Sequence, residues 1–297
     1  MILAAIDIGS NAARLLITEV IEQPNAKPLF NKLNLVRVPL RLGFDVFETR
    51  YISPVKITML LDTMLAFKHL MEAYKVQAVK ACATSAMRDA LNSKEVLDLV
   101  LDKTAIQIEI ITGDMEANLV YENHVAENMD LANSYMYIDV GGGSTELSFF
   151  TNGILRFKNS FNIGTIRILK NMVTDLHWDE MKNAIRAFTT GQKKVIAIGS
   201  GGNINKVFSL SKKKDGKPLS LELLRDYCKE LEAFPLEERI TRYSLRRDRA
   251  DVIVPAMSIY INAMRWANAD EIYVPKIGLA DGLIKHLWDE MKATAVK

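Results

Sequence analysis

The sequence predicts an α/β protein built from two similar halves. Short apolar segments typical of strands alternate along the chain with amphipathic segments typical of helices. The segments 4–11 (AAIDIGSN) and 136–143 (MYIDVGGG) share one pattern: an apolar strand ends in aspartate and leads through a glycine-containing turn into another apolar strand. The length of 297 residues suits two domains of ordinary size. We therefore expect a duplicated fold in which two acidic, glycine-lined turns face each other across a cleft.

In the first half, predicted strands and helices alternate. Residues 2–6 and 13–20 are expected to form two strands joined by a tight turn. Ser53 followed by Pro54 is typical of a helix start, with serine as the N-cap and proline at the first helical position. Further expected elements are a strand at 32–39, a helix at 53–74, a strand at 78–83, a helix at 94–103, a strand at 107–111 and a helix at 116–128.

The second half is expected to begin with a meander of strands. These strands are predicted at 135–140, 146–151 and 154–162. The elements expected after them are a helix at 178–189, a strand at 193–198, a helix at 203–210, an exposed polar loop at 212–218, and a mostly helical remainder with a strand at 271–274.

Composition excludes several classes of protein. Hydrophobic residues make up 49% of the chain and charged residues 25%, which is typical of a globular protein. The net charge is only +2, without a basic tail, so we expect no nucleic-acid partner. Cys82 and Cys228 form no CxxC motif, so we expect neither a disulfide framework nor a zinc site. The sequence shows no signal peptide and no apolar run of about 20 residues, so we expect a cytoplasmic protein that does not enter a membrane.

The segment 139–146 (DVGGGSTE) is the strongest candidate for a binding site. Three consecutive glycines permit close backbone approach, and successive free N–H groups in such a turn form a nest for phosphate oxygens. Ser144 and Thr145 add hydroxyl donors, and Asp139 at the strand end is suited to hold a hydrated magnesium ion. The plain alternative is a glycine-rich hairpin turn, which the entropic cost of three glycines disfavours.

Two further turns have the same character but carry weaker signals. The segment 7–11 (DIGSN) is, alone, as consistent with an ordinary hairpin loop as with a phosphate site. The segment 199–202 (GSGG) follows an apolar strand and opens a helix, an arrangement that presents N–H groups to an anion. Close packing of the helix on the strand explains its glycines equally well.

Two helix starts add candidate side chains. Thr84 and Ser85 follow a strand and could donate to phosphate, while Arg88 could bind it through two N–H groups. An N-cap followed by a solvated arginine is the commoner reason for this pattern. Glu116 could orient a water for in-line attack, but from the residues alone an acid favoured by the helix dipole in the first turn is the better explanation.

Together these segments resemble the exopolyphosphatase/guanosine pentaphosphate phosphatase (Ppx/GppA) family of the actin-like ATPase superfamily. The matching stretches occur in the family's order and cover nearly the whole chain. They are AAIDIGSN, RLGF (41–44), ATSAMRDALN (83–92), ITGDMEANLVY (111–121), YIDVGGGSTEL (137–147), NIGTIRIL (162–169) and AIGSGGNI (197–204).

The resemblance implies a fold and a domain organisation. The family fold is α/β, with two RNase H-like domains whose mixed sheets are flanked by helices and whose active-site cleft lies between them. Residues 1–119 would form the N-terminal domain and residues 120–282 the C-terminal domain. The last helix, 283–297, would pack back on the N-terminal domain.

The resemblance also implies roles for individual residues. Glu116 would be the catalytic base, and Asp139, Glu146 and Asp7 would hold a divalent cation, expected to be Mg²⁺. The expected activity is removal of terminal phosphate from inorganic polyphosphate by a homodimer. The residues that would bind phosphate are Gly9, Ser10, Asn11, Arg14, Thr84, Ser85, Arg88, Gly141, Gly142, Gly143, Ser144, Thr145 and Gly201.

The chain departs from the family pattern at three positions. Ala12 replaces a serine of the first turn, Met115 replaces the first of two adjacent glutamates, and Ala280 stands where the family often has arginine. Longer family members carry a further helical domain with His-Asp motifs, and the chain has no His-Asp dipeptide. We therefore expect a short member that retains Glu116 and Asp139.

Three alternative functions stay open from the sequence. The first is hydrolysis of the 5′-phosphate of pppGpp, which is also a terminal phosphoanhydride. The second is a sugar or acetate kinase of the same superfamily, which predicts a larger chain and an acceptor site. The third is a non-catalytic sensor that binds polyphosphate or a nucleotide, an alternative kept open by Ala12 and Met115.

Overall fold

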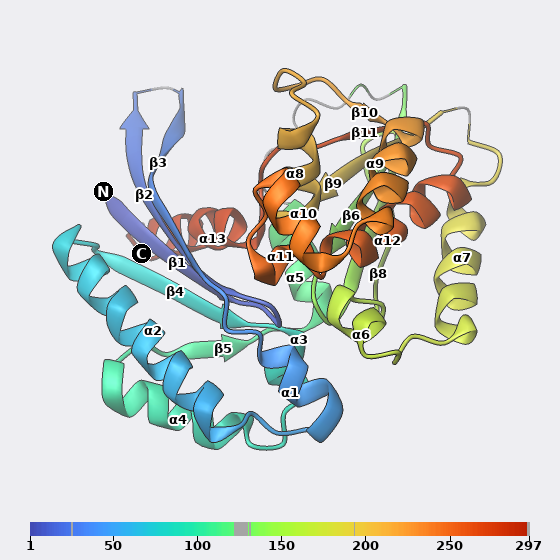
Figure 1. Cartoon of the computed structure of the whole chain (residues 1–297). Coiled ribbons are helices and arrows are strands. Elements are labelled where there is room, and N and C mark those ends of the chain that lie inside the picture. The colour runs from blue at the N-terminus through green and yellow to red at the C-terminus, as the bar shows by residue number, and fades with distance from the viewer. Residues whose placement is uncertain (25, 122–129, 131, 193, 296–297) are drawn as a thin grey trace. The chain divides into compact units, whose positions relative to one another are not determined.

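The computed structural model describes residues 1–24, 26–121, 130, 132–192 and 194–295. The chain divides into two compact units (Figure 1). Unit 1 consists of Met1–Asn123 and Leu279–Lys297, and unit 2 consists of His124–Gly278. Each unit is described by itself below.

Unit 1 is built on a five-stranded mixed sheet with the order β3-β2-β1-β4-β5. The central strand β1 runs antiparallel to β2 and parallel to β4. Apolar residues fill β1 and the first part of β2, so these stretches are largely buried, whereas the last three residues of β2 are exposed. The strands are β1 (Ile2–Ile8), β2 (Ala13–Gln23), β3 (Ala26–Val38), β4 (Ala78–Ala83) and β5 (Ile108–Ile110).

Helices cover both faces of this sheet (Figure 1). The last helix packs on β1, β2 and β4 and on α5, with Leu283, Leu287 and Trp288 buried against Leu3 and Leu16. α2 begins as expected, with Ser53 as N-cap and Pro54 at the first position. The helices of unit 1 are α1 (Leu42–Thr49), α2 (Pro54–Ala73), α3 (Ser85–Asp89), α4 (Ser93–Thr104), α5 (Gly113–Tyr121) and α13 (Leu279–Ala295).

Unit 2 is built on a six-stranded mixed sheet with the order β10-β11-β9-β6-β7-β8. Its central strand β6 runs antiparallel to β7 and parallel to β9. The strands are β6 (Ser134–Val140), β7 (Thr145–Thr151), β8 (Ile154–Phe161), β9 (Val195–Ser200), β10 (Leu219–Ser220) and β11 (Glu271–Tyr273).

The core of unit 2 forms between this sheet and its helices. The apolar helix α12 lies at its centre and buries Ile253, Met257 and Tyr260. The helices of unit 2 are α6 (Thr165–Leu169), α7 (Asp175–Thr189), α8 (Gly202–Leu210), α9 (Leu221–Ala233), α10 (Leu236–Tyr243), α11 (Arg247–Ala250) and α12 (Ile253–Trp266).

The two sheets share one topology, which confirms the predicted α/β class and the internal repeat. Strands β1, β2, β3, β4 and β5 correspond in order and direction to β6, β7, β8, β9 and β11. Asp7 lies opposite Arg14 across the first hairpin, and Asp139 lies opposite Glu146 across the second. The two aspartates therefore occupy equivalent positions.

Most expected elements are present, with shifted ends. β3 begins at Ala26, earlier than the expected residue 32, because it pairs with β2 almost to the hairpin turn. α7 begins at Asp175 because Thr174 and His177 form a capping box that the apolar spacing does not reveal. The helix expected at 116–128 is seen as α5 to Tyr121, and residues 122–128 lie outside the described part.

Two findings bear on the compositional expectations. Cys82 and Cys228 are both free thiols. Among the described residues, no helix combines the length and the hydropathy that crossing a membrane requires.

Candidate functional site

In unit 1, the turn after β1 is joined to the loop after β4. The Ser10 and Ser85 hydroxyl oxygens lie 2.8 Å apart, and the backbone N–H of Ala86 donates to Ser10 Oγ over 3.1 Å. Thr84 is fixed through its backbone N–H, which donates to the Ile8 carbonyl over 3.1 Å. The structure thus brings together three of the predicted phosphate-binding residues, from two segments far apart in the sequence.

The backbone of this first turn is also held from outside. Gly9 N–H donates to the Ala12 carbonyl over 3.0 Å, which closes the turn. The carbonyl of Ser10 accepts from Gly43 N–H at 2.9 Å, and that of Asn11 accepts from Arg41 N–H at 3.0 Å. The RLGF segment at the start of α1 therefore supports the turn.

Asp7 and Arg14 form an ion pair across the first hairpin. Arg14 Nη1 lies 2.5 Å from Asp7 Oδ2, and the Asp7 side chain is only 4% exposed. The guanidinium therefore offsets the charge that Asp7 would present to a cation. The roles of Asp7 as a cation ligand and of Arg14 as a phosphate ligand stay predictions, because the ion pair joins the two side chains to each other.

Glu116 lies in the first turn of α5 and is largely buried. Its Oε2 is 3.5 Å from Arg88 Nη1, and the same nitrogen donates to the Ile111 carbonyl over 2.6 Å. Arg88 thus joins the carboxylate of Glu116 to the end of the strand before it. Met115, which stands at the position of the family's first glutamate, packs against the core of unit 1.

The thiol of Cys82 shows that Asp7 and Glu116 contribute negative charge to the same region. Burial raises the pKa of Cys82 well above its usual value, and the nearby carboxylates of Asp7, Glu116 and Glu109 raise it further. Cys82 pairs with Asp7 across β4 and β1. The predicted base and the predicted aspartate therefore lie within electrostatic range of one buried atom.

In unit 2, Asp139 and Glu146 are directly opposed on neighbouring antiparallel strands. Glu146 is 4% exposed, and its Oε1 accepts a hydrogen bond from Ser160 Oγ at 2.8 Å. Like charges directly opposite each other destabilise a sheet, and a bound cation would offset their repulsion. Two carboxylates with phosphate oxygens and waters form the donor set that magnesium prefers, so these residues fit a divalent cation.

The described residues include no group of three or more His, Cys, Asp and Glu side chains arranged to hold a metal ion. A cation at Asp139 and Glu146 would therefore complete its shell with water and substrate oxygens.

Gly201 is packed against Asp139. Its φ is +114°, a conformation that other residues rarely adopt. A Cβ at this position would lie 3.3 Å from Asp139 Oδ1 and 3.3 Å from the Tyr260 hydroxyl. Tyr260 donates to the Ser200 carbonyl, and its pKa is raised well above the usual value, first by burial and then by the charge of Asp139. Gly201 is thus required for the fit of the β9–α8 loop around this carboxylate.

The three-glycine turn is closed in the same way as the first turn. Gly141 N–H donates to the Ser144 carbonyl over 2.9 Å. Gly164, at the start of α6, approaches this turn so closely that a Cβ there would lie 2.4 Å from the Gly142 carbonyl oxygen. The glycine at position 164 is therefore a requirement of this contact.

Thr145 uses its side chain within the fold. It is fully buried, and its hydroxyl donates to the Ile163 carbonyl over 2.6 Å. The hydrogen bond fixes the segment between β8 and α6 beside the turn. Phosphate binding by Thr145 stays a prediction, because the donor on its side chain already has an acceptor.

The predicted residues thus fall into two groups. Asp7, Ser10, Arg14, Ser85, Arg88 and Glu116 belong to unit 1, together with Gly9, Asn11 and Thr84. Asp139, Glu146, Gly201 and the turn 141–145 belong to unit 2. Sequence reasoning did not identify Ser160, Gly164 or Tyr260. Of these, only Gly164 carried a signal, since it lies in the NIGTIRIL stretch that matched the family.

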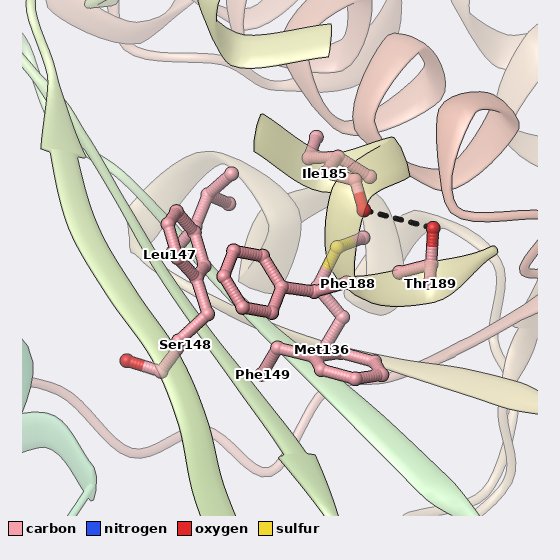
Figure 2. Close-up of a pocket in the computed structure, with 8 residues that line it drawn as sticks. Met136, Leu147, Ser148, Phe149, Ile185, Phe188 and Thr189 are labelled. Atoms are coloured by element: carbon pink, nitrogen blue, oxygen red, sulfur yellow. Dashed lines mark hydrogen bonds between the residues drawn. The ribbon is translucent and has the colours of Figure 1, made fainter. Parts of the chain in front are cut away.

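Unit 2 also contains an apolar pocket (Figure 2), whose lining includes none of these residues. Strands β6 to β8 and helix α7 contribute its lining, which includes no charged side chain: Met136, Leu147, Ser148, Phe149, Phe157, Ile185, Phe188 and Thr189. The Thr189 hydroxyl donates to the Ile185 carbonyl over 2.9 Å, and Phe157 stacks on Phe188. This pocket offers no charged group for phosphate or for a cation.

The chain has an actin-like ATPase fold: two mixed sheets share one topology, and each has an aspartate before a tight turn. The model of the Ppx/GppA phosphatase family matches residues 20–291, so the chain belongs to this family. A crystal structure of the Aquifex aeolicus family member is 25% identical, with a TM-score of 0.76 over 98% of each chain. A crystal structure of an exopolyphosphatase from Cytophaga hutchinsonii, 23% identical, shows the same fold with a TM-score of 0.82 over 98% of each chain.

The names of the relatives that match the chain describe different activities. The exopolyphosphatase 2 of Mycobacterium tuberculosis is 31% identical over 172 residues, which cover 56% of this chain and 53% of the relative. The guanosine-5′-triphosphate,3′-diphosphate pyrophosphatase of Pseudoalteromonas translucida is 26% identical over 301 residues, which cover 95% of this chain and 57% of the relative. A bifunctional 3-dehydroquinate synthase/phosphatase of Fusobacterium nucleatum is 32% identical over 56% of this chain and 25% of the relative. The chain spans about half the length of the first two relatives.

Proposed function

We propose that the chain is a hydrolase that removes the terminal phosphate from inorganic polyphosphate with the help of a divalent cation. The observation that carries this proposal is the opposed pair Asp139 and Glu146 at the base of a turn of three glycines. Backbone N–H groups for phosphate and carboxylates for a cation are thereby offered by one hairpin. Family membership and the exopolyphosphatase among the relatives support the choice of substrate.

The turn of unit 2 is assigned to the terminal phosphate. N–H groups of the turn and the Ser144 hydroxyl would donate to phosphate oxygens, and Gly201 would allow close approach of the β9–α8 loop. Asp139 and Glu146 would hold the cation, proposed to be Mg²⁺. A bound divalent cation supplies positive charge that offsets the charge of the phosphate oxygens. Asp7 is assigned a lesser part, because it is already paired with Arg14.

Unit 1 is assigned the activation of water. Glu116 would accept a proton from the attacking water, and Arg88 would hold the carboxylate in place through its contact of 3.5 Å. Ser10 and Ser85 would donate hydroxyl hydrogen bonds to phosphate from the joined loops. Phosphoryl transfer depends mainly on positioning and electrostatic stabilisation, which is the kind of contribution these groups can make.

A second candidate is hydrolysis of the 5′-phosphate of pppGpp. Its support is the extent of similarity, since the guanosine-5′-triphosphate,3′-diphosphate pyrophosphatase matches 95% of this chain and the exopolyphosphatase 2 only 56%. Both substrates end in a phosphoanhydride, so the same groups would serve either reaction.

Phosphate release from the purified chain tests the proposal, with magnesium present and polyphosphate, pppGpp and ATP supplied in parallel. We expect the highest kcat/KM on polyphosphate. Preference for pppGpp would establish the second candidate in its place. Binding of these anions without any release would contradict the hydrolase and favour a sensor. The proposal includes a homodimer located in the cytoplasm, and analytical ultracentrifugation would test the dimer.

A further inference from the structure

Helix α6 begins with three donors directed at three consecutive carbonyl groups of the glycine turn. Thr165 N–H donates to the Gly141 carbonyl over 3.1 Å, and Ile166 N–H donates to the Gly142 carbonyl over 2.8 Å. The third donor is a side chain, because Arg167 Nε donates to the Gly143 carbonyl over 2.7 Å. The start of α6 therefore binds the turn through two backbone N–H groups and the side chain of Arg167.

These three bonds determine where the N–H groups of the turn point. In a planar trans peptide the C=O and the N–H point in opposite directions. The carbonyls of Gly141, Gly142 and Gly143 belong to the peptides whose N–H groups are those of Gly142, Gly143 and Ser144. Since the carbonyls face α6, these N–H groups face away from it. Within the described part of the chain, none of the three N–H groups has a protein acceptor.

The orientation of this turn needs external support because glycine is conformationally permissive. Gly142 and Gly143 have no Cβ that would favour one rotation of their peptides over another. An anion that binds only the turn with outward N–H groups has an affinity reduced by the fraction of molecules in other conformations. Among the residues that the structure describes, the backbone of α6 holds the first two peptides and the Arg167 side chain holds the third.

We infer that Arg167 is a positioning residue that keeps the Gly143–Ser144 peptide turned so that Ser144 N–H faces the bound phosphate. The inference rests on the proposed function, because it assigns the turn to phosphate. A guanidinium donor is suited to this task, since its planar group donates along a fixed direction and stays charged. Removal of the bond would leave the backbone of α6 intact and would release one peptide of the turn.

The test compares Arg167→Gln and Arg167→Lys with wild type and with Arg265→Gln. Arg265 lies in the last turn of α12 and donates to Asn262 Oδ1, so its variant removes an exposed arginine of the same unit. We measure KM and kcat for polyphosphate, the binding of inorganic phosphate by calorimetry, and Tm. Arg167→Gln should raise KM and the phosphate Kd together by about tenfold, the effect of losing one charged hydrogen bond.

The expected pattern differs from that of a structural role. Tm of Arg167→Gln should fall no further than that of Arg265→Gln, and Arg167→Lys, which keeps a cationic donor, should recover part of the phosphate affinity. An unchanged phosphate Kd in Arg167→Gln would overturn the inference. So would a loss of affinity that only follows a fall in Tm.

A second variant tests the packing of α6 on the same turn without changing charge. Gly164→Ala would place a Cβ 2.4 Å from the Gly142 carbonyl oxygen and must displace the turn. It should weaken phosphate binding more than Arg167→Gln, and an unaltered phosphate Kd in the folded variant would contradict the inference. Failure of the proposed function has a different signature. In that case the wild type releases phosphate from none of the substrates or preferentially from pppGpp, and calorimetry with inorganic phosphate still decides whether Arg167 orients the turn.

Discussion

The hairpins β1–β2 and β6–β7 have equivalent strand pairing around their aspartates but carry different charges. In both, an aspartate is the second-last residue of the first strand and a glycine N–H closes the turn, over 3.0 Å in unit 1 and 2.9 Å in unit 2. The residue opposite the aspartate is Arg14 in unit 1 and Glu146 in unit 2. One hairpin therefore carries its own positive charge, whereas the other concentrates negative charge suited to a cation. The duplicated fold places the two aspartates equivalently, and the residue opposite each aspartate, Arg14 or Glu146, determines which ions the hairpin can bind.

The two turns also differ in the residues that form them. The turn of unit 1 contains Ser10, Asn11 and Ala12, and two of its carbonyls accept bonds from the start of α1. The turn of unit 2 is made of glycines, and three of its carbonyls accept bonds from α6 and Arg167. The turn of unit 1 therefore offers polar side chains where the turn of unit 2 has glycines.

The largest expected effect tests the assignment of water activation to unit 1. Glu116→Gln should lower kcat by about 10² to 10⁴, because the variant cannot accept the proton of the attacking water. Glu109→Gln is the control, since Glu109 is exposed on the neighbouring strand β5 and also lies near Cys82. Steady-state phosphate release measures both. Full turnover by Glu116→Gln would contradict the assignment of Glu116 as the general base.

The charge difference between the hairpins predicts a large effect on stability. Arg14→Gln leaves the buried Asp7 carboxylate without its ion pair and should lower the free energy of unfolding by about 1–3 kcal/mol. The double variant Arg14→Gln with Asp7→Asn should recover most of this loss. Urea unfolding of the wild type, Arg14→Gln, Asp7→Asn and the double variant measures the cycle. Stability of Arg14→Gln equal to that of the wild type would show that the pair contributes nothing measurable.

The packing around Asp139 predicts a comparable effect. Gly201→Ala should lower stability by about 1–3 kcal/mol, because alanine is strained at the φ of +114°. It should also weaken cation binding, since the added Cβ meets Asp139 Oδ1. Gly191→Ala is the matched control, with a φ of +83° and nothing near its Cβ. Loss of cation binding in both variants would argue against a local contact at Asp139.

The opposed carboxylates of unit 2 predict a smaller change of opposite sign. Glu146→Gln should stabilise the metal-free protein by about 0.2–1 kcal/mol, because it removes a like-charge pair across the sheet. The same variant should gain less Tm from added magnesium than the wild type does. Thermal unfolding with and without magnesium tests both statements. A destabilised metal-free variant would indicate that Glu146 serves the fold through Ser160.

The smallest expected effect concerns α13, the helix that covers the sheet of unit 1. The hydrogen bond from Lys80 lowers the pKa of Glu290 below its usual value of 4.5. The pair therefore stabilises unit 1 above the unfolded-state pKa, and the contribution is lost as the pH falls through the folded-state pKa. Since Glu290 is half-exposed, Glu290→Gln should cost less than about 1 kcal/mol at pH 7 and nothing at a pH well below the folded-state pKa. Equal losses at both pH values would exclude this linkage.

Local sequence signals predicted the strands, the repeat and the two turns. Apolar runs that end in aspartate identified β1 and β6, and glycine identified the turn between Asp139 and Glu146. What escaped prediction depends on contacts between distant segments. The pairing of Arg88 with Glu116 and the burial of Tyr260 beside Asp139 arise only when the sheet has assembled. Arg167 carried no local signal of its target, because the Gly143 carbonyl lies on another element.

The most direct test of the division between the hairpins is calorimetric titration with magnesium of the wild type, Asp139→Asn and Asp7→Asn. The account predicts that Asp139→Asn abolishes magnesium binding while Asp7→Asn retains it, because Arg14 already neutralises Asp7. Magnesium binding that survives in Asp139→Asn and is lost in Asp7→Asn would contradict the account and would place the cation at the hairpin of unit 1.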